Sequence, residues 1–500
     1  MERPGYNSHQ EREYMARGWW RDDDTLWRWL QRHAGSRPEH PAVVSAAGVL
    51  TWRALHDRVL KVANGLRKKG IAAGDVVALQ LPNIPEFLIA HLAIARLGAV
   101  MCTVHMPYRG AEIESILTHS GAKLFFNTAY PFAELEAAEP LPADHPVPDA
   151  RDPFLLLYTS GTTASPKAVA HAYRTMLGNS RMGAQEHRLS DQSRVLCPAP
   201  FSHLYGLYSL HCAWSVGACS VLLPAFKPDE LAQTVERERP TAMWTAPAHV
   251  AACRNAGLFD QHDWSSLELA IVSGSMAPPA LVRHFAERLP GCAVTQLWGM
   301  TELQAALYTR PDDGTEAAAT SAGRPSPGTQ VRISGEGELQ VRGPLTFSGY
   351  YNNEDANRGA FTADGWFRSG DLGVQDEARR TIFKGRLRET LRISHFMVAP
   401  GEIEAFLMAH PDVAQAFVVG VPDPKLNEAP VAYVVPREGA FLTEAALRAF
   451  CRGKIASYKI PTVIRFVKDV PRTPGPHGDK VQRGKLREQA IREHAKGAAT

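Results

Sequence analysis

The sequence has few cysteines, no large excess of charge of either sign and no long uninterrupted hydrophobic run. Its 500 residues include seven cysteines, none of them in a CxxC pair. This scarcity argues against a zinc site or a disulfide framework and favours a reducing cytoplasm. Lys and Arg total 55 and Asp and Glu total 52, so we expect no surface for nucleic acid.

The sequence also shows no pattern typical of a signal peptide or of a membrane-spanning helix. The N-terminus, MERPGYNSHQEREYMARGWW, is charged and lacks the apolar core of a signal peptide. The most apolar stretch, residues 87–102, is interrupted by His91 and Arg96 and is too short to span a bilayer. We expect this stretch to form a buried amphipathic helix, and we expect no membrane partner.

The chain is too long for a single hydrophobic core, and its pattern changes along its length. Short β-rich runs alternate with helical stretches up to about residue 320, which predicts an α/β fold with largely parallel sheets. Residues 328–344 then alternate apolar and polar side chains, which predicts an antiparallel hairpin. The remainder is typical of a small α+β unit, and we place the boundary between domains 1–388 and 389–500. The predicted strands of the first part are residues 76–81, 123–127, 154–160, 194–200, 219–224, 242–247, 269–275 and 293–299.

One stretch, YTSGTTASPKAVAH at residues 158–171, is rich in hydroxyl side chains and follows an apolar run. Its hydroxyls and unobstructed backbone N–H groups are suited to surround phosphate oxygens, and Lys167 adds a cation. The stretch is not a Walker A loop, because Ala168 follows the lysine. The alternative is a simple Ser/Thr turn between a strand and a helix. The predicted phosphate-binding residues are Thr159, Ser160, Gly161, Thr162, Thr163 and Lys167.

Further motifs follow in a fixed order, and together with the phosphate loop they resemble those of the adenylate-forming superfamily. This superfamily includes acyl-CoA synthetases, nonribosomal-peptide adenylation domains and luciferases. The resemblance implies a large N-terminal domain of two α/β subdomains plus a β-barrel, and a small mobile α+β C-terminal domain. The motifs are LWGMTE (297–302), RSGDLG (368–373), FKGRLRETLRI (383–393), PGEIEAFL (400–407) and DKVQRGKLRE (479–488).

The resemblance implies an ATP-dependent ligase that joins a carboxylic acid to AMP, releases pyrophosphate and passes the acyl group to a nucleophile. Because an anion must approach an anionic phosphate, catalysis has to supply cations and donors. Glu302 would bind Mg²⁺, assisted by Thr162 or Thr163, and Thr301 would contact the α-phosphate. Lys480 would neutralise the reacting phosphate and carboxylate. The alternative for Glu302 and Lys480 is an ordinary solvated side chain.

The same resemblance implies which residues contact the nucleotide. Trp298 would offer a flat face to adenine, although a tryptophan in an apolar run is usually a core residue. Asp371 would accept hydrogen bonds from the ribose hydroxyls, and Arg386 would add a planar donor fork. Glu389 matches the hinge about which the C-terminal domain rotates. Close approach of the base would be allowed by Gly274 and Gly299.

The segment PFSHLYGL at residues 200–207 matches the acid pocket of the superfamily. His203 would lie near the substrate carboxylate or gate the acceptor tunnel, or it would be a structural histidine. Aromatic and Met side chains nearby favour an apolar acid, such as an aryl acid, although each could equally belong to the core. The predicted pocket residues are Phe201, Tyr205, Gly206, Trp244, Met276 and Met300.

The sequence departs from the superfamily at several positions. Ala164 and Ala168 stand where glycine is usual, and a positive φ there would cost about 1 kcal/mol. Ser394 and His395 replace the glycines that border the pantetheine passage of CoA ligases. The acceptor is therefore left open between the CoA thiol and an amine, with a carrier protein as a third choice. A non-catalytic nucleotide sensor is the remaining alternative, and the presence of Glu302 and Lys480 argues against it.

Overall fold

The structure, a computed structural model, describes residues 8–159, 167–275, 277–393, 396–423, 426–473 and 480–497. The chain divides into two compact units, of which the first contains residues up to Val331 together with Val341–Phe367. The second contains Arg332–Gln340 and the residues from Arg368 onward. The boundary that we predicted between Arg388 and Glu389 lies inside the second unit and stays a prediction.

The first unit contains two sheets, and the smaller carries the predicted phosphate loop. Its strands are parallel, apart from the antiparallel pair at one edge that flanks the loop. The three central strands are buried on both faces, which explains their continuous apolar sequences. In sheet order the strands are β5 (Leu124–Asn127), β3 (Val76–Gln80), β4 (Val100–Thr103), β6 (Pro153–Tyr158) and β7 (Ala168–Ala172).

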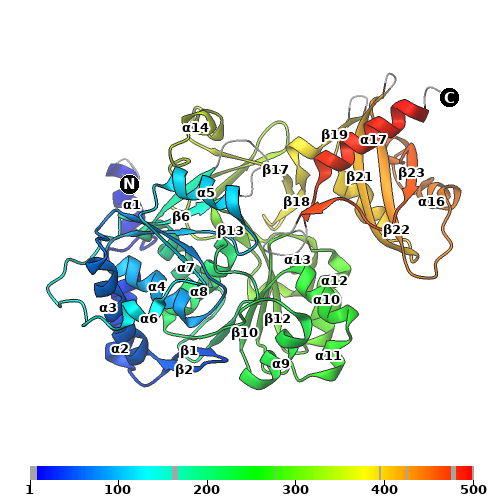
Figure 1. The fold of residues 1–500 in the computed structure, drawn as a ribbon. Helices are drawn as coiled ribbons and strands as arrows, with labels where there is room; N and C mark the ends of the chain where they lie inside the picture. Colours follow the sequence, from blue (N-terminus) through cyan, green and yellow to red (C-terminus); the bar gives the residue numbers. More distant parts are fainter. Residues whose placement is uncertain are drawn as a thin grey trace. The chain divides into compact units, whose positions relative to one another are not determined.

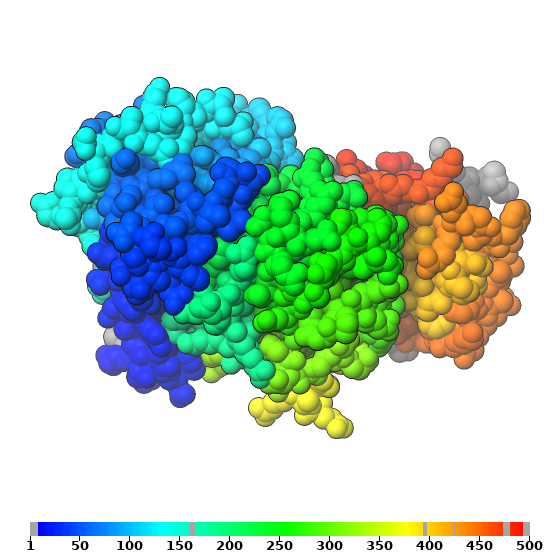
Figure 2. Space-filling view, turned by 90° about the horizontal axis from the view of Figure 1, so that it is seen from below, coloured from blue at the N-terminus to red at the C-terminus, as the bar shows by residue number. Residues whose placement is uncertain are grey.

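The larger sheet of the first unit is parallel in its centre and antiparallel at both ends. Both sheets confirm the predicted α/β pattern, and the eight predicted runs each contain a strand. The blue and cyan segments of the first unit lie beside its green segments in both views (Figures 1 and 2). In sheet order the strands are β14 (Arg324–Pro325), β13 (Gln304–Tyr308), β12 (Ala293–Met300), β11 (Leu269–Val272), β10 (Ala242–Thr245), β8 (Arg194–Leu196), β9 (Cys219–Val221), β1 (Pro41–Ser45) and β2 (Gly48–Thr51).

The helices of the first unit cover these sheets, and no described helix is long and apolar enough to cross a membrane. The helix predicted for residues 87–102 is α4, which ends at Arg96, and residues 100–102 belong to strand β4 instead. All residues of α4 except Glu86 are buried, so the helix is not amphipathic. Its Arg96 donates to the carbonyls of Pro146 and His145 and lies over Trp27. The helices are α1 (Ser8–Ala16), α2 (Leu26–Ser36), α3 (Trp52–Lys68), α4 (Pro85–Arg96), α5 (Gly110–Ser120), α6 (Phe132–Glu136), α7 (Tyr173–Glu186), α8 (Leu204–Val216), α9 (Pro228–Glu238), α10 (Pro247–Asn255), α11 (Leu258–Gln261), α12 (Pro279–Arg288), η1 (Pro311–Asp313), α13 (Gly314–Thr320) and α14 (Glu354–Ala360).

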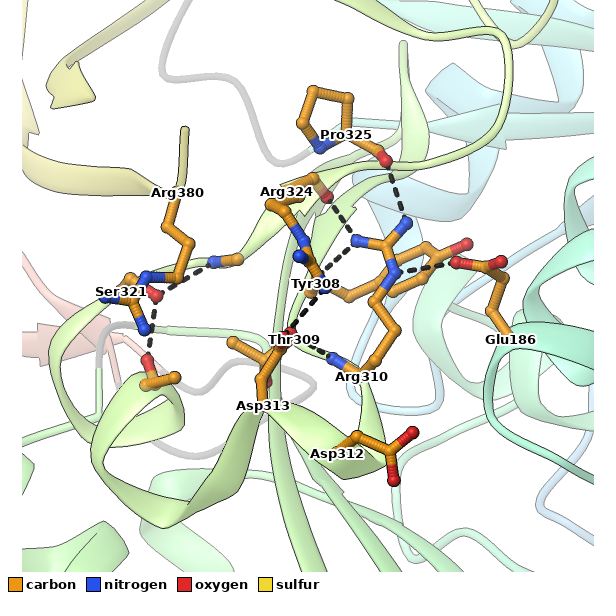
Figure 3. Close-up of polar contacts among 12 residues, drawn as sticks. Glu186, Tyr308, Thr309, Arg310, Asp312, Asp313, Ser321, Arg324, Pro325 and Arg380 are labelled. Carbon is orange, nitrogen blue, oxygen red and sulfur yellow. Dashed lines mark hydrogen bonds and ion pairs between the residues drawn. The ribbon is translucent and has the colours of Figure 1, made fainter. Parts of the chain in front are cut away.

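One arginine fixes the end of the β12–β13 hairpin, which carries the LWGMTE motif. Figure 3 shows the guanidinium of Arg310, which donates to Glu186 at 2.6 Å and to the carbonyl oxygens of Arg324 and Pro325 at 3.0 and 2.9 Å. Its plane also lies 4.6 Å from the ring centroid of Tyr308. The fork of one arginine therefore joins α7, β13 and β14, which a lysine could not do with a single ammonium.

The second unit contains a four-stranded sheet and the C-terminal α+β body. The hairpin predicted at residues 328–344 is β15–β16, and the four-stranded sheet stands where the resemblance implied a β-barrel. The C-terminal body is an α+β unit, as we expected. The elements are β15 (Gln330–Ile333), β16 (Glu338–Arg342), β17 (Phe367–Gln375), β18 (Thr381–Arg386), η2 (Leu387–Glu389), β19 (Leu391–Ile393), β20 (Phe396–Val398), α15 (Pro400–Met408), β21 (Val413–Asp423), β22 (Asn427–Pro436), α16 (Glu444–Cys451), η3 (Ser457–Lys459), β23 (Val463–Phe466), β24 (Arg472–Thr473), β25 (Lys480–Val481) and α17 (Arg483–Gly497).

Two histidines meet in the core of the first unit. The Nε2 atoms of His91 on α4 and His211 on α8 are 2.9 Å apart, and both side chains are fully buried. Burial lowers the pKa of His91 to about 3 and that of His211 well below its usual value. Both rings are therefore neutral near pH 7, one donating and the other accepting.

This pair predicts that the fold loses stability in mild acid. The unfolded chain takes up a proton at each histidine below a pKa of about 6.5. In the native chain the pKa of His91 is lowered to about 3 and that of His211 is also well below its usual value, so neither ring takes up a proton in mild acid. His91 alone should therefore remove about 2 kcal/mol of unfolding free energy between pH 7 and pH 5. Urea denaturation of a His91→Leu/His211→Leu variant should show a correspondingly flatter pH dependence. Parallel pH curves for the variant and the parent protein would contradict this assignment.

Candidate functional site

The predicted phosphate loop connects two antiparallel strands. β6 ends at Tyr158 and β7 begins at Ala168, and the N–H of Thr159 donates to the carbonyl of Lys167 at 2.8 Å. The strand–turn–helix alternative is therefore wrong, because a second strand intervenes before α7. Ala168 is an extended strand residue without positive φ, so the strain expected there is absent. Loop residues Ser160, Gly161, Thr162, Thr163 and Ala164 lie outside the described residues.

A distant segment, Tyr350–Tyr351, lies alongside the beginning of β7. The N–H of Tyr351 donates to the carbonyl of Ala168 at 2.7 Å, and Tyr350 forms an isolated bridge with Val169. This pairing brings the ring of Tyr350 to the base of the loop, where the Nζ of Lys167 lies 5.3 Å from the ring centroid. The contact is a cation–π interaction, which holds Lys167 beside the loop.

Glu302 lies between β12 and β13, and it is buried, with 9% of its surface exposed. The hydroxyl of Tyr350 donates to Oε1 of Glu302 at 2.7 Å. Burial raises the pKa of Tyr350, and the Glu302 carboxylate raises it further, so the phenol keeps its proton and remains a donor. Tyr350 therefore joins the predicted Mg²⁺ ligand to the predicted phosphate-loop cation. Our sequence analysis missed this residue, although the aromatic pair in SGYYNN was a visible signal.

The remaining residues of LWGMTE lie on β12 and just after it. Trp298 and Met300 are half-buried on one face of the strand and pack against an apolar cluster that includes Phe347. A side chain on Gly299 would bring its Cβ within 1.8 Å of the Gln304 carbonyl, at an irregularity in the β12–β13 pairing. The hairpin itself therefore requires this glycine. Thr301 is half-buried, and Gly274 follows β11 with φ of +88°.

The predicted acid-pocket segment forms the beginning of α8. His203 caps this helix, because its Nδ1 accepts from the N–H of Tyr205 at 3.3 Å. A Cβ on Gly206 would lie 2.3 Å from the Pro200 carbonyl, so the helix can start here only with glycine. Phe201 is buried, and its N–H donates to the side chain of Asn83 at 2.8 Å.

The other predicted pocket residues lie deeper. Trp244 is fully buried on β10 and packs in the same cluster as Tyr205. The hydroxyl of Tyr205 lies 2.7 Å from the Ile271 carbonyl and 3.1 Å from the Thr245 carbonyl, which ties α8 to β10 and β11. Their role in an acid pocket stays a prediction, and Met276 lies outside the described residues.

A second imidazole, not anticipated from the sequence, lies beside His203. The ring centroids of His105 and His203 are 6.1 Å apart, and Nδ1 of His105 is 2.9 Å from Oγ of Ser202. Burial lowers the pKa of His105 to about 4, so this ring is neutral near pH 7. His105 comes directly after a buried strand, β4, as polar site residues of α/β folds often do.

The second unit holds the predicted ribose-binding, hinge and catalytic-lysine residues. Asp371 on β17 and Arg386 on β18 are opposite one another in the sheet, with Oδ1 and Nε 3.4 Å apart. Asp371 is buried and Arg386 is exposed enough to reach solvent. Glu389 ends η2, and the backbone of Lys480 begins β25 opposite Thr473. The side chain of Lys480 lies outside the described residues.

The donor set on the described residues suits Mg²⁺ that is shared with phosphates. Within the ranges that the structure describes, no three His, Cys, Asp or Glu side chains gather to form a protein-only metal cage. Glu302, between β12 and β13, supplies a single buried carboxylate that accepts from Tyr350. Mg²⁺ is commonly held by one or two carboxylates plus phosphate oxygens and water, so one carboxylate fits.

Comparisons with known proteins agree with this geometry. The family model for AMP-binding enzymes matches residues 30–351, and the model for their C-terminal domain matches residues 402–475. A sulfoacetate–CoA ligase of Cupriavidus necator is 33% identical, with 93% of this chain and 97% of that protein covered. An indoleacetate–CoA ligase of Aromatoleum aromaticum is 30% identical, with 94% and 98% covered. The structure of an amide bond synthetase from Marinactinospora thermotolerans superposes with a TM-score of 0.80 at 27% identity, with 93% and 99% covered.

The Tyr350–Glu302 hydrogen bond should be required for the metal-dependent step. A Tyr350→Phe variant keeps the ring under Lys167 and removes the donor to the carboxylate. A hydrogen bond to a charged group is worth about 1.5–3 kcal/mol, so acid-dependent exchange of pyrophosphate into ATP should fall about 10- to 100-fold. The Mg²⁺ concentration for half-maximal exchange should rise.

The neighbouring tyrosine provides the control. The ring of Tyr351 meets His119 edge-on, and a Tyr351→Phe change removes only its hydroxyl. Exchange and Mg²⁺ dependence should stay at the parent level in this variant. An unchanged Mg²⁺ requirement in Tyr350→Phe would show that the phenol does not orient a metal ligand.

Proposed function

Because the chain belongs to the family of AMP-binding enzymes, it is an ATP-dependent, AMP-forming acid ligase, and we propose that it joins an apolar carboxylic acid to CoA. The observation that supports the ATP-dependent step is the contact chain Lys167–Tyr350–Glu302. It ties the lysine of a phosphate loop to a buried carboxylate of the kind that shares Mg²⁺ with phosphates. The family uses ATP, and its CoA ligases use CoA as the second substrate.

The first half-reaction brings the acid onto the α-phosphate of ATP. Mg²⁺ held by Glu302, with help from Thr162, would offset charge on the phosphates, and Lys167 would add a second cation. Thr301, next to Glu302, would donate to the α-phosphate. Lys480 would neutralise the carboxylate and the phosphate as they react. Acyl-AMP and pyrophosphate are the products.

The nucleotide would be bound by the residues that the resemblance assigns to it. In the second unit, Asp371 would accept from the ribose hydroxyls, and Arg386 would turn its fork from Asp371 to the nucleotide. In the first unit, Trp298 would stack on adenine, with Gly274 and Gly299 beside it. We place the rotation between the two half-reactions at Glu389.

The acid pocket would begin at α8. Phe201, Tyr205 and Trp244 make this region apolar and aromatic, which favours an aryl or other apolar acid. The relatives act on chemically different acids, so the choice of acid rests on these side chains. Gly206, Met276 and Met300 complete the proposed lining.

The local geometry favours a thiol acceptor over an amine. An amine must lose a proton to react, so an amide synthetase would benefit from a base beside the acyl-AMP. His203 accepts a backbone hydrogen bond at Nδ1, which places the proton of the neutral ring on Nε2. In that tautomer His203 is a donor for the substrate carboxylate or carbonyl. The resemblance places Ser394 and His395 at the border of the pantetheine passage, but both residues lie outside the described residues.

The first test is the adenylation half-reaction. Incubation with ATP, Mg²⁺ and a panel of aryl and aliphatic acids should release pyrophosphate in an acid-dependent manner. A Lys480→Ala variant should be slower by about 10²–10³, on the scale of losing one transition-state donor. Lys485→Ala removes an exposed lysine of the same segment and should have no effect. The ligase proposal fails if no acid stimulates release in the parent protein.

The second test identifies the acceptor. With the best acid, CoA should yield a thioester, detected by mass spectrometry, at a higher rate than simple amines yield amides. The reason is that a thiol is partly ionised near neutral pH, whereas an amine without a base stays protonated. Efficient amide formation together with an absence of thioester would replace CoA by an amine and would leave the adenylation step intact.

A further inference from the structure

One arginine of the second unit binds two carboxylates at once. Arg483 is the first residue of α17, and its NH1 and NH2 groups donate to the two oxygens of Glu404 at 2.6 and 2.8 Å. Its Nε lies 3.3 Å from Oε2 of Glu389. NH1 also donates to the carbonyl of Val418 at 3.2 Å. All three nitrogens of the guanidinium are therefore engaged.

The two contacts of Arg483 differ in kind. Glu404 on α15 is buried, binds Arg483 in a bidentate pair and also accepts from the N–H of Val418 at 2.7 Å. Loss of this pair would leave a buried carboxylate without its cation, which is strongly destabilising. The contact with Glu389 is longer, involves one oxygen, and its side chains are 27% and 30% exposed. Such a pair is weak enough to form and break during function.

The sequence positions of Glu389 and Arg483 link their ion pair to the proposed hinge. Arg483 comes three residues after Lys480, at the junction of β25 and α17, whereas Glu389 is the proposed hinge. A change of ψ at residue 389 leaves its carboxylate with the chain before it and moves Arg483 with the chain after it. The Glu389–Arg483 pair must then separate. The pair exists in one state of the hinge and is absent from the other.

We infer that the Glu389–Arg483 ion pair is a latch that sets the balance between the two half-reactions, with Arg483 as a positioning residue that also anchors the Lys480 segment through Glu404. The inference rests on the proposed function only for its kinetic effect. The latch stabilises the hinge conformation in which η2 is formed. Arg483 thereby connects the state of the hinge to the segment that supplies the catalytic lysine.

The test compares two carboxamide variants. Glu389→Gln removes the latch and leaves the Arg483–Glu404 pair intact. Glu493→Gln is the matched control, because Glu493 lies on α17, the helix that begins at Arg483. Glu493 pairs with Arg465 at 2.8 Å, and its side chain is 33% exposed. In Glu389→Gln the ratio of pyrophosphate exchange to acyl transfer from preformed acyl-AMP should change up to about fivefold, since such pairs contribute at most about 1 kcal/mol. The control should keep the parent ratio.

Two further measurements make the result decisive. Raising the salt concentration should move the parent ratio toward that of Glu389→Gln and leave the variant unchanged, because exposed ion pairs are screened. Hydrogen exchange at residues 387–391 should be faster in Glu389→Gln than in the parent or in Glu493→Gln, and this readout needs no enzyme activity. Unchanged exchange and an unchanged ratio, or an equal loss of both half-reactions, would overturn the latch. A parent protein without pyrophosphate exchange would refute the ligase proposal, and hydrogen exchange alone would then decide the latch.

Discussion

The hydrogen bond between Tyr350 and Glu302 holds together three segments that are distant in the sequence. Tyr350 reaches Glu302 because Tyr351 pairs with Ala168, at the first residue of β7. The same pairing fixes the base of the phosphate loop and brings Lys167 against the phenol ring. Displacement of this tyrosine would therefore disturb the cation, the carboxylate and the loop together, which is why the rest of the site depends on it.

The first unit around this contact contains paired buried polar groups. Some of these pairs are neutral, and in others a positive side chain is matched by a negative one. His91 and His211 join α4 to α8 as neutral rings, which avoids the large cost of a buried cation. Glu186 neutralises the charge of Arg310, and backbone carbonyls accept from its NH1 and NH2 groups. Such paired groups favour one arrangement of helices and strands, because separating the partners would leave further buried polar atoms unpaired.

The sequence allowed the strands and the order of the motifs to be predicted, because both are local patterns. Eight of the strands from β3 to β12 appear as short apolar runs, whereas β4 and β7 were not predicted. LWGMTE contains its own hairpin turn. Long-range pairing was not predictable in this way. Nothing near residues 158–171 indicates that β7 would follow the loop or that Tyr350 would bridge to Val169. The depth of Trp244 was equally hidden, since an apolar run does not reveal which side chain faces a pocket.

The second unit also contains an arginine paired with a buried carboxylate, but here the arginine, Arg483, makes one strong contact and one weak contact. The bidentate pair with buried Glu404 holds α17 against α15 and β21, and Arg483 comes three residues after Lys480. The single contact with Glu389 lies at the chain's predicted pivot and is accessible to water and salt. The proposed rotation at Glu389 needs both a rigid body and an adjustable joint. The geometry of Arg483 provides both from a single guanidinium, since its terminal nitrogens bind Glu404 while Nε faces Glu389.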